Sequence, residues 1–239
     1  MNILSFDTST RSASVALMMD GVLVGEILIN DKRTHSQKLM PMLESLMSLA
    51  DISIDDIDLL AVCVGPGSFT GIRIAVATVK AISHAKNLPI VAINSMENIA
   101  FNVMDSSKKI VSILDAQAGN VYCGICRSVE DNNYSVVEGV DVISLEQLAN
   151  RLECSSENYI IVGEALDKYR EKLNFDNVEF ASPDKNVSRS SALCSIAKIK
   201  YDKGLDIYDC YTILPKYLRK SQAEMQYDEK QRKAKENDI

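Results

Sequence analysis

ILSFDTST, the stretch at residues 3–10, is an apolar run that ends in a cluster of turn-forming residues. The apolar pattern resumes at 14–18, and the hairpin-turn pair Asp20-Gly21 leads into another apolar run at 22–28. Short apolar runs bounded by turn residues are typical of β-strands. The beginning of the chain therefore predicts a three-stranded meander in which Asp7 ends the first strand.

The same organisation returns near the middle of the chain. VSILD at 111–115 is again an apolar run that ends in an aspartate, and a polar turn and two further strand-like runs follow it. Asp115 thus takes the place of Asp7. Because internal repetition is a clue to the whole fold, we expect two related lobes. The predicted division is an N-terminal lobe, a C-terminal lobe and a charged tail, at residues 1–103, 104–220 and 221–239.

Two helices and a glycine-rich loop are expected between the repeats. Apolar residues recur at three- and four-residue spacing over 36–50, the mark of an amphipathic helix. A buried strand at 59–64 runs into GPGSFTG at 65–71, and 72–86 is then a helix rich in small residues, which let another helix approach closely. Further helices are expected near Ser95, after a capping box at Ser144, and over 190–203.

Two lobes that each begin with a strand, a turn and a meander are the pattern of the α/β proteins of the actin, hexokinase and Hsp70 (ASKHA) class, in which mixed sheets are flanked by helices. In that class the first turn faces nucleotide phosphate and metal, which makes Asp7, Thr8 and Ser9 nucleotide-binding candidates. The residues alone leave a second interpretation open. Asp and Thr at a strand end also form simple Asx and ST turns.

The glycine loop adds candidates for the same site. A glycine-rich turn that opens a helix presents free backbone N–H groups and a positive dipole end, which favours Gly65, Gly67 and Ser68 as anion-binding residues. The loop is not a P-loop, since GxxxxGK[ST] is absent, and it is one residue too long for GxGxxG. The structural alternative is a tight turn with Thr70 as the helix N-cap.

Composition limits what the chain does alone. It has 239 residues, a net charge of −7, and no apolar stretch near the roughly 20 residues that a membrane-spanning helix needs. We expect a cytoplasmic protein without a membrane partner that does not grip a nucleic-acid backbone by itself, because phosphate contacts need Lys and Arg. The pair Cys123 and Cys126 lies in a strand-like run, where such residues point to opposite faces, so we expect reduced cysteines.

No self-sufficient active site is evident. The only histidines, His35 and His84, begin neither HxxxH nor HExxH, and GxSxG is absent. A catalytic histidine needs partner groups that the sequence does not supply nearby. We therefore predict no catalytic residue and no metal site.

Several particular strings carry a resemblance to a known family. They are MNILSFDTST at 1–10, HSQ at 35–37 before LMP at 39–41, VGPGSFTGIR at 64–73, LDA at 114–116, VY at 121–122 and PKYLR at 215–219. Over about residues 1–220 the chain resembles the bacterial TsaB (YeaZ) family. That family is similar to a shortened TsaD, the enzyme that attaches a threonylcarbamoyl group to adenosine 37 of tRNAs reading codons that begin with A (ANN).

The resemblance implies that the chemistry of TsaD is lost. TsaD-like proteins carry a metal-binding NHxxxH string just after a strand, and the matching string here is NSMENI at 94–99. The two histidine positions hold Ser95, a poor ligand, and Ile99, which is no ligand. The expected role is a pseudo-enzyme of tRNA threonylcarbamoyladenosine (t6A) biosynthesis. Descriptions of the family as peptidases (M22-like) rest on the shared fold, which does not fix function.

The resemblance also implies partners. TsaD and TsaE are the expected partners, with a homodimer when the chain is alone and tRNA bound only through the complex. No cofactor of its own is expected, and ATP or ADP is a candidate ligand at an interface of the complex. By analogy the two helices would pack against TsaD. The predicted partner-binding residues are His35, Lys38, Leu39, Met42, Leu43, Leu46, Arg73, Ile74, Ala77, Lys80 and Ala81. The alternative is that these faces pack only on their own sheet, above all Leu39, Leu43 and Leu46. The rival function is an independent small-molecule kinase or ATPase that uses Asp7 and the glycine loop.

Overall fold

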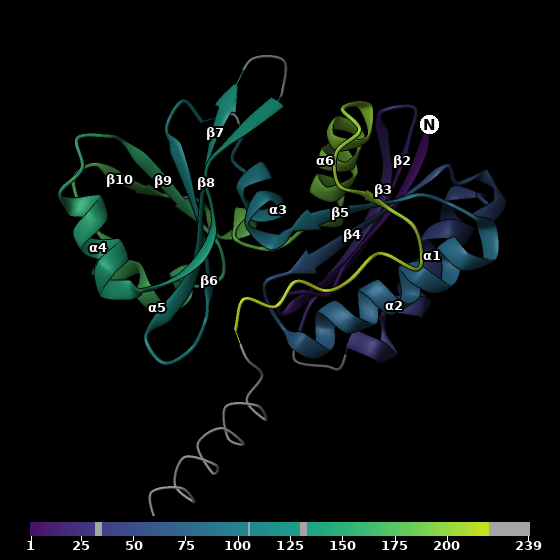
Figure 1. Ribbon diagram of the computed structural model, residues 1–239, viewed down its shortest axis with the longest axis horizontal. Coiled ribbons are helices and arrows are strands. Elements are labelled where there is room, and N and C mark those ends of the chain that lie inside the picture. Colours follow the sequence, from purple (N-terminus) through teal and green to yellow (C-terminus); the bar gives the residue numbers. More distant parts are fainter. Residues whose placement is uncertain (32–34, 105, 130–132, 220–239) are drawn as a thin grey trace, which may run out of the picture.

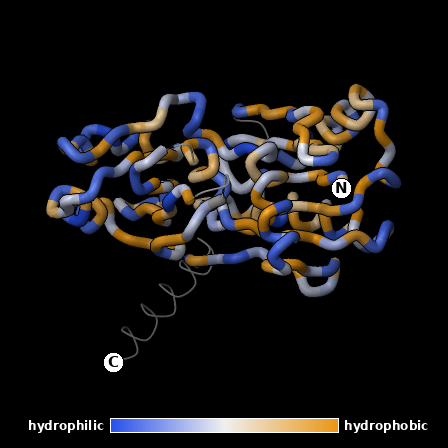
Figure 2. Tube along the Cα trace, turned by 90° about the horizontal axis from the view of Figure 1, so that it is seen from above, coloured by the Kyte–Doolittle hydropathy of each residue, from blue (hydrophilic) through white to orange (hydrophobic). Residues whose placement is uncertain are grey.

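The structure is a computed structural model that describes residues 1–31, 35–104, 106–129 and 133–219. Two sheets stand side by side, each with helices against it, and α3 (Ser95–Phe101) lies between them (Figure 1). In the hydropathy view of Figure 2, apolar segments run through both halves of the molecule and polar segments gather at the turns. The predicted ASKHA-type α/β fold with two lobes is confirmed.

The first sheet has the order β11-β5-β4-β1-β2-β3. Strands β1, β2 and β3 form the predicted antiparallel meander, while β4 and β5 are added parallel to β1. Residues Asp20 and Gly21 both have positive φ in the turn between β2 and β3, as the hairpin pair requires. The strands are β1 (Asn2–Asp7), β2 (Ser12–Met19), β3 (Val22–Asn30), β4 (Leu59–Gly65), β5 (Ile90–Asn94) and β11 (Ile207–Tyr208).

The second sheet repeats this topology in the order β10-β9-β6-β7-β8. A meander of β6, β7 and β8 is extended by β9 and β10 parallel to β6, so each strand matches its counterpart in the first lobe. The predicted internal repetition is therefore real. The strands are β6 (Lys109–Asp115), β7 (Asn120–Val129), β8 (Asn133–Ser144), β9 (Tyr159–Val162) and β10 (Val178–Phe180).

Helices cover both faces of each sheet and enclose four apolar clusters. In the first lobe α1 (Leu39–Ala50) and α2 (Phe69–Lys86) cover one face, and α6 (Ser190–Asp202) covers the other. In the second lobe α4 (Leu145–Glu153) and α5 (Leu166–Tyr169) lie on one face, and α3 lies on the other. Short 3-10 helices occur at His35–Gln37, Ile54–Asp56, Arg170–Leu173 and Pro183–Lys185.

The predicted division of the chain needs one correction. The sequence predicts that residues 104–220 form the C-terminal lobe, yet Leu193 and Ile196 of α6 pack with Ile3 and Ala16 of the first sheet, and β11 pairs with β5. The chain thus returns to the first lobe, because the second face of that sheet is apolar and needs a helix to bury it. The predicted tail at 221–239 lies outside the described residues.

Local features follow the sequence closely, with one exception. Ser144 and Gln147 form the predicted capping box at the start of α4. Helix α2 begins earlier than predicted, at Phe69, and its N-cap is Ser68 rather than Thr70, because the Ser68 side chain accepts a hydrogen bond from the Gly71 N–H. Cys123 and Cys126 belong to apolar clusters on opposite faces of the second sheet, as predicted.

The six cysteines are free thiols in the structure. Among the residues that the structure describes, no helix is both long enough and apolar enough to cross a membrane.

Candidate functional site

The turn after β1 and the glycine loop after β4 lie against each other at one end of the first sheet. Because β1 and β4 are parallel neighbours, both turns emerge at the same sheet edge. The Ser68 N–H donates to the Ser9 carbonyl oxygen at 2.7 Å, and Thr8 Oγ1 donates to the Gly71 carbonyl oxygen at 2.7 Å. The structure therefore brings the nucleotide-binding candidates of both stretches together.

The glycines of this loop are required by contacts within the protein. A Cβ atom on Gly67 would overlap the Ser9 carbonyl oxygen, and one on Gly71 would overlap that of Thr8. At Gly65, which has a φ of +106°, a Cβ atom would lie 2.8 Å from the Lys216 carbonyl oxygen. Close backbone approach explains all three glycines without a ligand. Nucleotide binding by Gly65, Gly67 and Ser68 stays a prediction.

Asp7 is fully buried beneath this loop pair and is held by three donors. Its Oδ1 accepts from the Ser9 N–H at 2.7 Å, and its Oδ2 accepts from Asn98 Nδ2 and Ser188 Oγ, each at 2.6 Å. Burial raises the pKa of Asp7, and the hydrogen bonds from Ser188, Ser9 and Asn98 offset part of this effect. Asp7 thus joins β1 to α3 and to the segment before α6.

The polar cluster around Asp7 includes residues that the sequence did not reveal. Asn98 and Ser188 are completely buried, and the Asn98 Oδ1 atom has no hydrogen-bond partner among the residues that the structure describes. Glu164, just after β9, accepts a hydrogen bond from the Arg11 N–H at 3.4 Å. Burial is the main cause that raises the pKa of Glu164, and the negative charge of Asp7 makes a smaller contribution in the same direction. Of these three residues, only Asn98 belongs to a motif that the sequence analysis singles out, NSMENI at 94–99. No local sequence pattern distinguishes Ser188 or Glu164.

The two positions that correspond to metal-binding histidines are part of the protein interior. Ser95 Oγ donates to the Pro66 carbonyl oxygen at 2.6 Å, and its side chain is fully buried. Ile99 is also fully buried, among apolar residues that line the second sheet. The start of α3 is therefore packed into the protein interior through these two side chains.

The counterpart of Asp7 in the second lobe has different surroundings. Asp115 is exposed, its Oδ2 accepts from Lys168 Nζ at 3.0 Å, and its Oδ1 accepts from the Gln117 N–H and the Tyr169 hydroxyl. Partial burial opposes the charge, but the hydrogen bonds from Lys168, the Gln117 N–H and Tyr169, together with the charge of Lys168, outweigh it and lower the pKa of Asp115. The repeat of the strand and turn is thus not a repeat of the buried cluster.

The predicted partner surface on α1 needs correction. Leu39, Met42, Leu43 and Leu46 are almost entirely buried in the core between α1 and the first sheet. They belong to the apolar stripe of an amphipathic helix, which faces its own sheet. The alternative stated for the leucines is confirmed, and it extends to Met42. The exposed apolar residues of α1 are instead Met40 and Leu49.

The predicted surface on α2 is accessible. Arg73, Ala77 and Ala81 are exposed on one face of the helix, while Ile74 and Lys80 are half-buried. His35 and Lys38 are half-buried before α1, and His35 Nε2 donates to the Thr10 carbonyl oxygen at 2.9 Å. The structure therefore leaves an exposed stripe of small residues along α2.

A segment near the end of the chain, residues 209–219, runs along α2 toward the glycine loop (Figure 1). We call it the C-terminal strap. Lys80 Nζ donates to the Ile213 carbonyl oxygen at 3.2 Å, and Arg73 Nε donates to the Tyr217 hydroxyl at 2.7 Å. Both predicted docking cations on α2 thus hold the strap, a connection that the sequence did not reveal.

Comparison with known proteins agrees with this architecture. The family described as "TsaD: tRNA N6-adenosine threonylcarbamoyltransferase" matches residues 23–227. A Bacillus subtilis relative, "tRNA threonylcarbamoyladenosine biosynthesis protein TsaB", is 29% identical over 97% of this chain and 100% of its own length. The Escherichia coli protein of the same name is 28% identical over 68% of this chain and 71% of its own length.

Solved structures support the same assignment. YeaZ from Pseudomonas aeruginosa superposes with a TM-score of 0.80 and 25% identity, over 91% of this chain and 99% of that one. Component A of the (R)-2-hydroxyglutaryl-CoA dehydratase from Acidaminococcus fermentans has a TM-score of 0.51 at 11% identity, over 85% and 98% of the two chains, which is a likeness of fold alone. The chain belongs to the TsaD family and, within it, groups with the TsaB (YeaZ) proteins of tRNA threonylcarbamoyladenosine biosynthesis.

Proposed function

We propose that the chain is a non-catalytic partner subunit that binds TsaD, together with TsaE, and thereby enables threonylcarbamoyl transfer to adenosine 37 of tRNAs that read ANN codons. The observation that carries the proposal is the identity of the residues at the two metal-binding positions. Ser95 and Ile99 are fully buried, and Ser95 is hydrogen-bonded to the Pro66 carbonyl oxygen. Neither residue supplies the imidazole nitrogen that the related enzyme uses.

The exposed face of α2 supports a role in docking. Ala77 and Ala81 lie one turn apart on this face, and small side chains allow the backbone of a second helix to come close. Met40 and Leu49 of the neighbouring helix α1 are also exposed, on opposite flanks of that helix. A helix pair from the partner would bury this surface, and in the absence of the partner a second copy would do so.

In this proposal the nucleotide binds at an interface of the complex rather than to this chain alone. The glycine loop and the turn after β1 hydrogen-bond to each other, and backbone atoms approach Gly65, Gly67 and Gly71 closely. ATP or ADP would therefore bind at an interface that TsaD completes. The complex would act on tRNA in the cytoplasm.

Size-exclusion chromatography with light scattering tests the proposal. The chain is measured alone and mixed with TsaD of the same cell, with and without ATP, and we expect a heterodimer in the mixture. The variant Ala77→Arg should prevent this complex, because a long charged side chain separates the helices. Val137→Arg, at an exposed position of β8 in the other lobe, is the matched control and should still bind.

Two outcomes would overturn the proposal. One is a mixture in which the two proteins elute separately at micromolar concentration with and without TsaE. The other is ATP consumption by the purified chain alone that Asp7→Ala abolishes, which would favour the independent kinase or ATPase.

A further inference from the structure

The C-terminal strap is firmly attached to the first lobe. Ile213 is 1% exposed within the core that α1 and α2 share, and the Lys216 N–H donates to the Val64 carbonyl oxygen at 2.8 Å. The ring of Tyr217 stacks on Phe69 with centroids 4.7 Å apart and an interplanar angle of 12°. A buried anchor, a backbone hydrogen bond and a ring stack fix the path of the strap beside α2.

This fixed backbone presents large apolar side chains to solvent. Tyr211 is 75% exposed and Leu214 is 66% exposed, and Tyr217 and Leu218 are each more than 40% exposed. An isolated exposed leucine needs no explanation, but four large apolar side chains within eight residues form a patch. The patch adjoins the exposed stripe of α2, because Tyr211 contacts His84 and Tyr217 contacts Arg73 on that helix.

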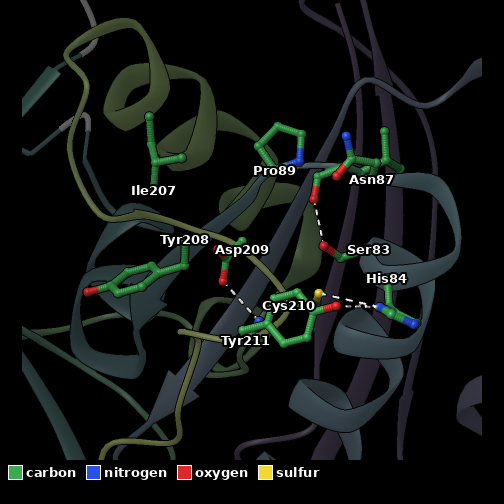
Figure 3. Close-up of a pocket in the computed structure, with 10 residues that line it drawn as sticks. Ser83, His84, Asn87, Pro89, Ile207, Tyr208, Asp209, Cys210 and Tyr211 are labelled. Atoms are coloured by element: carbon green, nitrogen blue, oxygen red, sulfur yellow. Dashed lines mark hydrogen bonds between the residues drawn. The ribbon is translucent and has the colours of Figure 1, made fainter.

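The surface is hollowed at one end of the strap. A pocket of about 530 Å³ lies between the end of α2 and the residues that lead from β11 into the strap (Figure 3). The Tyr211 ring meets His84 edge to face, and Cys210 and Asp209 stand beside it. A protruding side chain of a docked protein has room to enter here, next to the apolar patch.

The charge of this surface differs from that of the whole chain. Helix α2 and the strap together carry five Lys or Arg and one Asp, whereas the whole chain has 26 Lys or Arg and 33 Asp or Glu. Asp209 is occupied by its own turn, since Oδ1 accepts from the Tyr211 N–H and from Thr212. The surface is thus a basic region on an acidic protein, and its complement is an apolar surface with acidic residues at the rim.

Two other occupants fit these observations less well. A second copy that used the same face about a two-fold axis would bring like charges together, so it fits this face less well than the partner and would occupy it only in the partner's absence. Nucleic acid is held mainly by cations, but the strap itself carries two, Lys216 and Arg219, beside four exposed large apolar side chains. Leucine side chains also offer nothing to a phosphate backbone.

We infer that the C-terminal strap is part of the docking surface, and that Tyr211, Leu214 and Leu218 contact an apolar, acid-rimmed surface of the partner protein beside the α2 stripe. The inference rests on the proposed function, which supplies the partner, and extends the contact beyond the two helices. The strap would widen the interface on the side of α2 that faces away from α1.

The test measures binding of the full-length chain to TsaD by isothermal titration calorimetry. Leu214→Glu adds a charge at an exposed position, so the variant should fold with an unchanged Tm, yet its Kd for the partner should rise by about tenfold or more. Val137→Glu, exposed on β8, is the control and should leave the Kd unchanged. Hydrogen exchange should show slower exchange of the amides of residues 211–214 and 216–218 in the complex.

The outcomes separate this inference from the proposed function. If the unaltered chain binds and Leu214→Glu binds equally well without added protection of the strap, the inference is overturned and the proposed function stands. If the unaltered chain does not bind at all, both are overturned. Binding of tRNA to the chain alone that Leu214→Glu abolishes would also overturn the inference, because it would assign the patch to nucleic acid.

Discussion

Thr8 and Gly71 hold each other at the base of the glycine loop: Thr8 Oγ1 donates to the Gly71 carbonyl oxygen at 2.7 Å, and the Thr8 carbonyl oxygen occupies the space that a Cβ atom on Gly71 would fill. The obstacle is backbone rather than a flexible side chain. A substitution at Gly71 must therefore separate the loop from the turn after β1.

We expect Gly71→Ala to lower the free energy of unfolding by about 3 kcal/mol, because overpacking against backbone cannot relax locally. The measurement is thermal or urea unfolding followed by circular dichroism. Gly139→Ala is the matched control, since nothing lies within 4 Å of a Cβ atom there, and it should change stability by less than about 1 kcal/mol. Equal effects of the two substitutions would contradict the packing argument.

The buried carboxyl of Asp7 predicts a pH dependence of stability. Because its pKa is raised in the folded state, the folded protein holds this proton at a pH where the unfolded chain has lost it. The associated stability is fully present below the unfolded pKa, near 3.8, and is lost as pH rises through the folded pKa. Asp7→Asn removes this dependence, so the Tm of the variant relative to the unaltered chain should rise with pH across that window.

Asp7→Asn has a second expected effect, on Glu164. Burial is the main reason why the pKa of Glu164 is raised, and the charge of Asp7 adds to it. Carboxyl NMR titration should therefore find a lower pKa for Glu164 in the variant. A Tm difference that is flat with pH, together with an unchanged Glu164 titration, would show that Asp7 carries no charge change in the folded protein.

Thiol reactivity should divide the six cysteines into two groups. Cys154 is exposed and Cys210 is half-buried, whereas burial raises the pKa of the other four, Cys63, Cys123, Cys126 and Cys194, to about 12. Because the thiolate is the reactive form, Ellman's reagent at pH 8 should modify Cys154 first and then Cys210. The others should react only in denaturant. Cys154→Ser should remove the fast phase, and fast reaction of three or more thiols in the native protein would contradict the burial.

Local patterns in the sequence predicted much of this fold, because the features concerned are themselves local. The meander at the beginning, its repeat ending in Asp115 and the capping box at Ser144 each depend on residues close in sequence. The packing of α6 on the first sheet does not depend on neighbouring residues, and the sequence of an amphipathic helix does not show which apolar face it will cover. Its partners Ile3 and Ala16 lie far away along the chain.

The candidate site follows the same rule: its local stretches could be predicted from the sequence, and its contacts between distant residues could not. The stretches at Asp7 and Gly65 were found because turn residues follow apolar runs, and parallel pairing of β1 and β4 brings them together. Ser188, which donates to Asp7 from 181 residues away, is one serine among many in the sequence. The contact of the strap with Arg73 likewise joins distant residues that carry no shared motif.

A buried ion cluster between the lobes gives the last prediction. Lys200 of α6 is 7% exposed and its Nζ lies 2.6 Å from Glu97 of α3 and 2.8 Å from Asp206, while the Tyr134 hydroxyl of β8 donates to Glu97 at 3.2 Å. Burial opposes the charge on Lys200, but Glu97 and Asp206 outweigh it and raise its pKa.

Lys200→Met should lower the free energy of unfolding by about 3 kcal/mol, because it leaves the buried Glu97 carboxylate without a cation. Lys198→Met, on the same helix, breaks only an exposed pair with Asp202 and should cost at most about 0.5 kcal/mol. Urea unfolding at pH 7 measures both, and equal losses would mean that the cluster contributes no more than a surface pair.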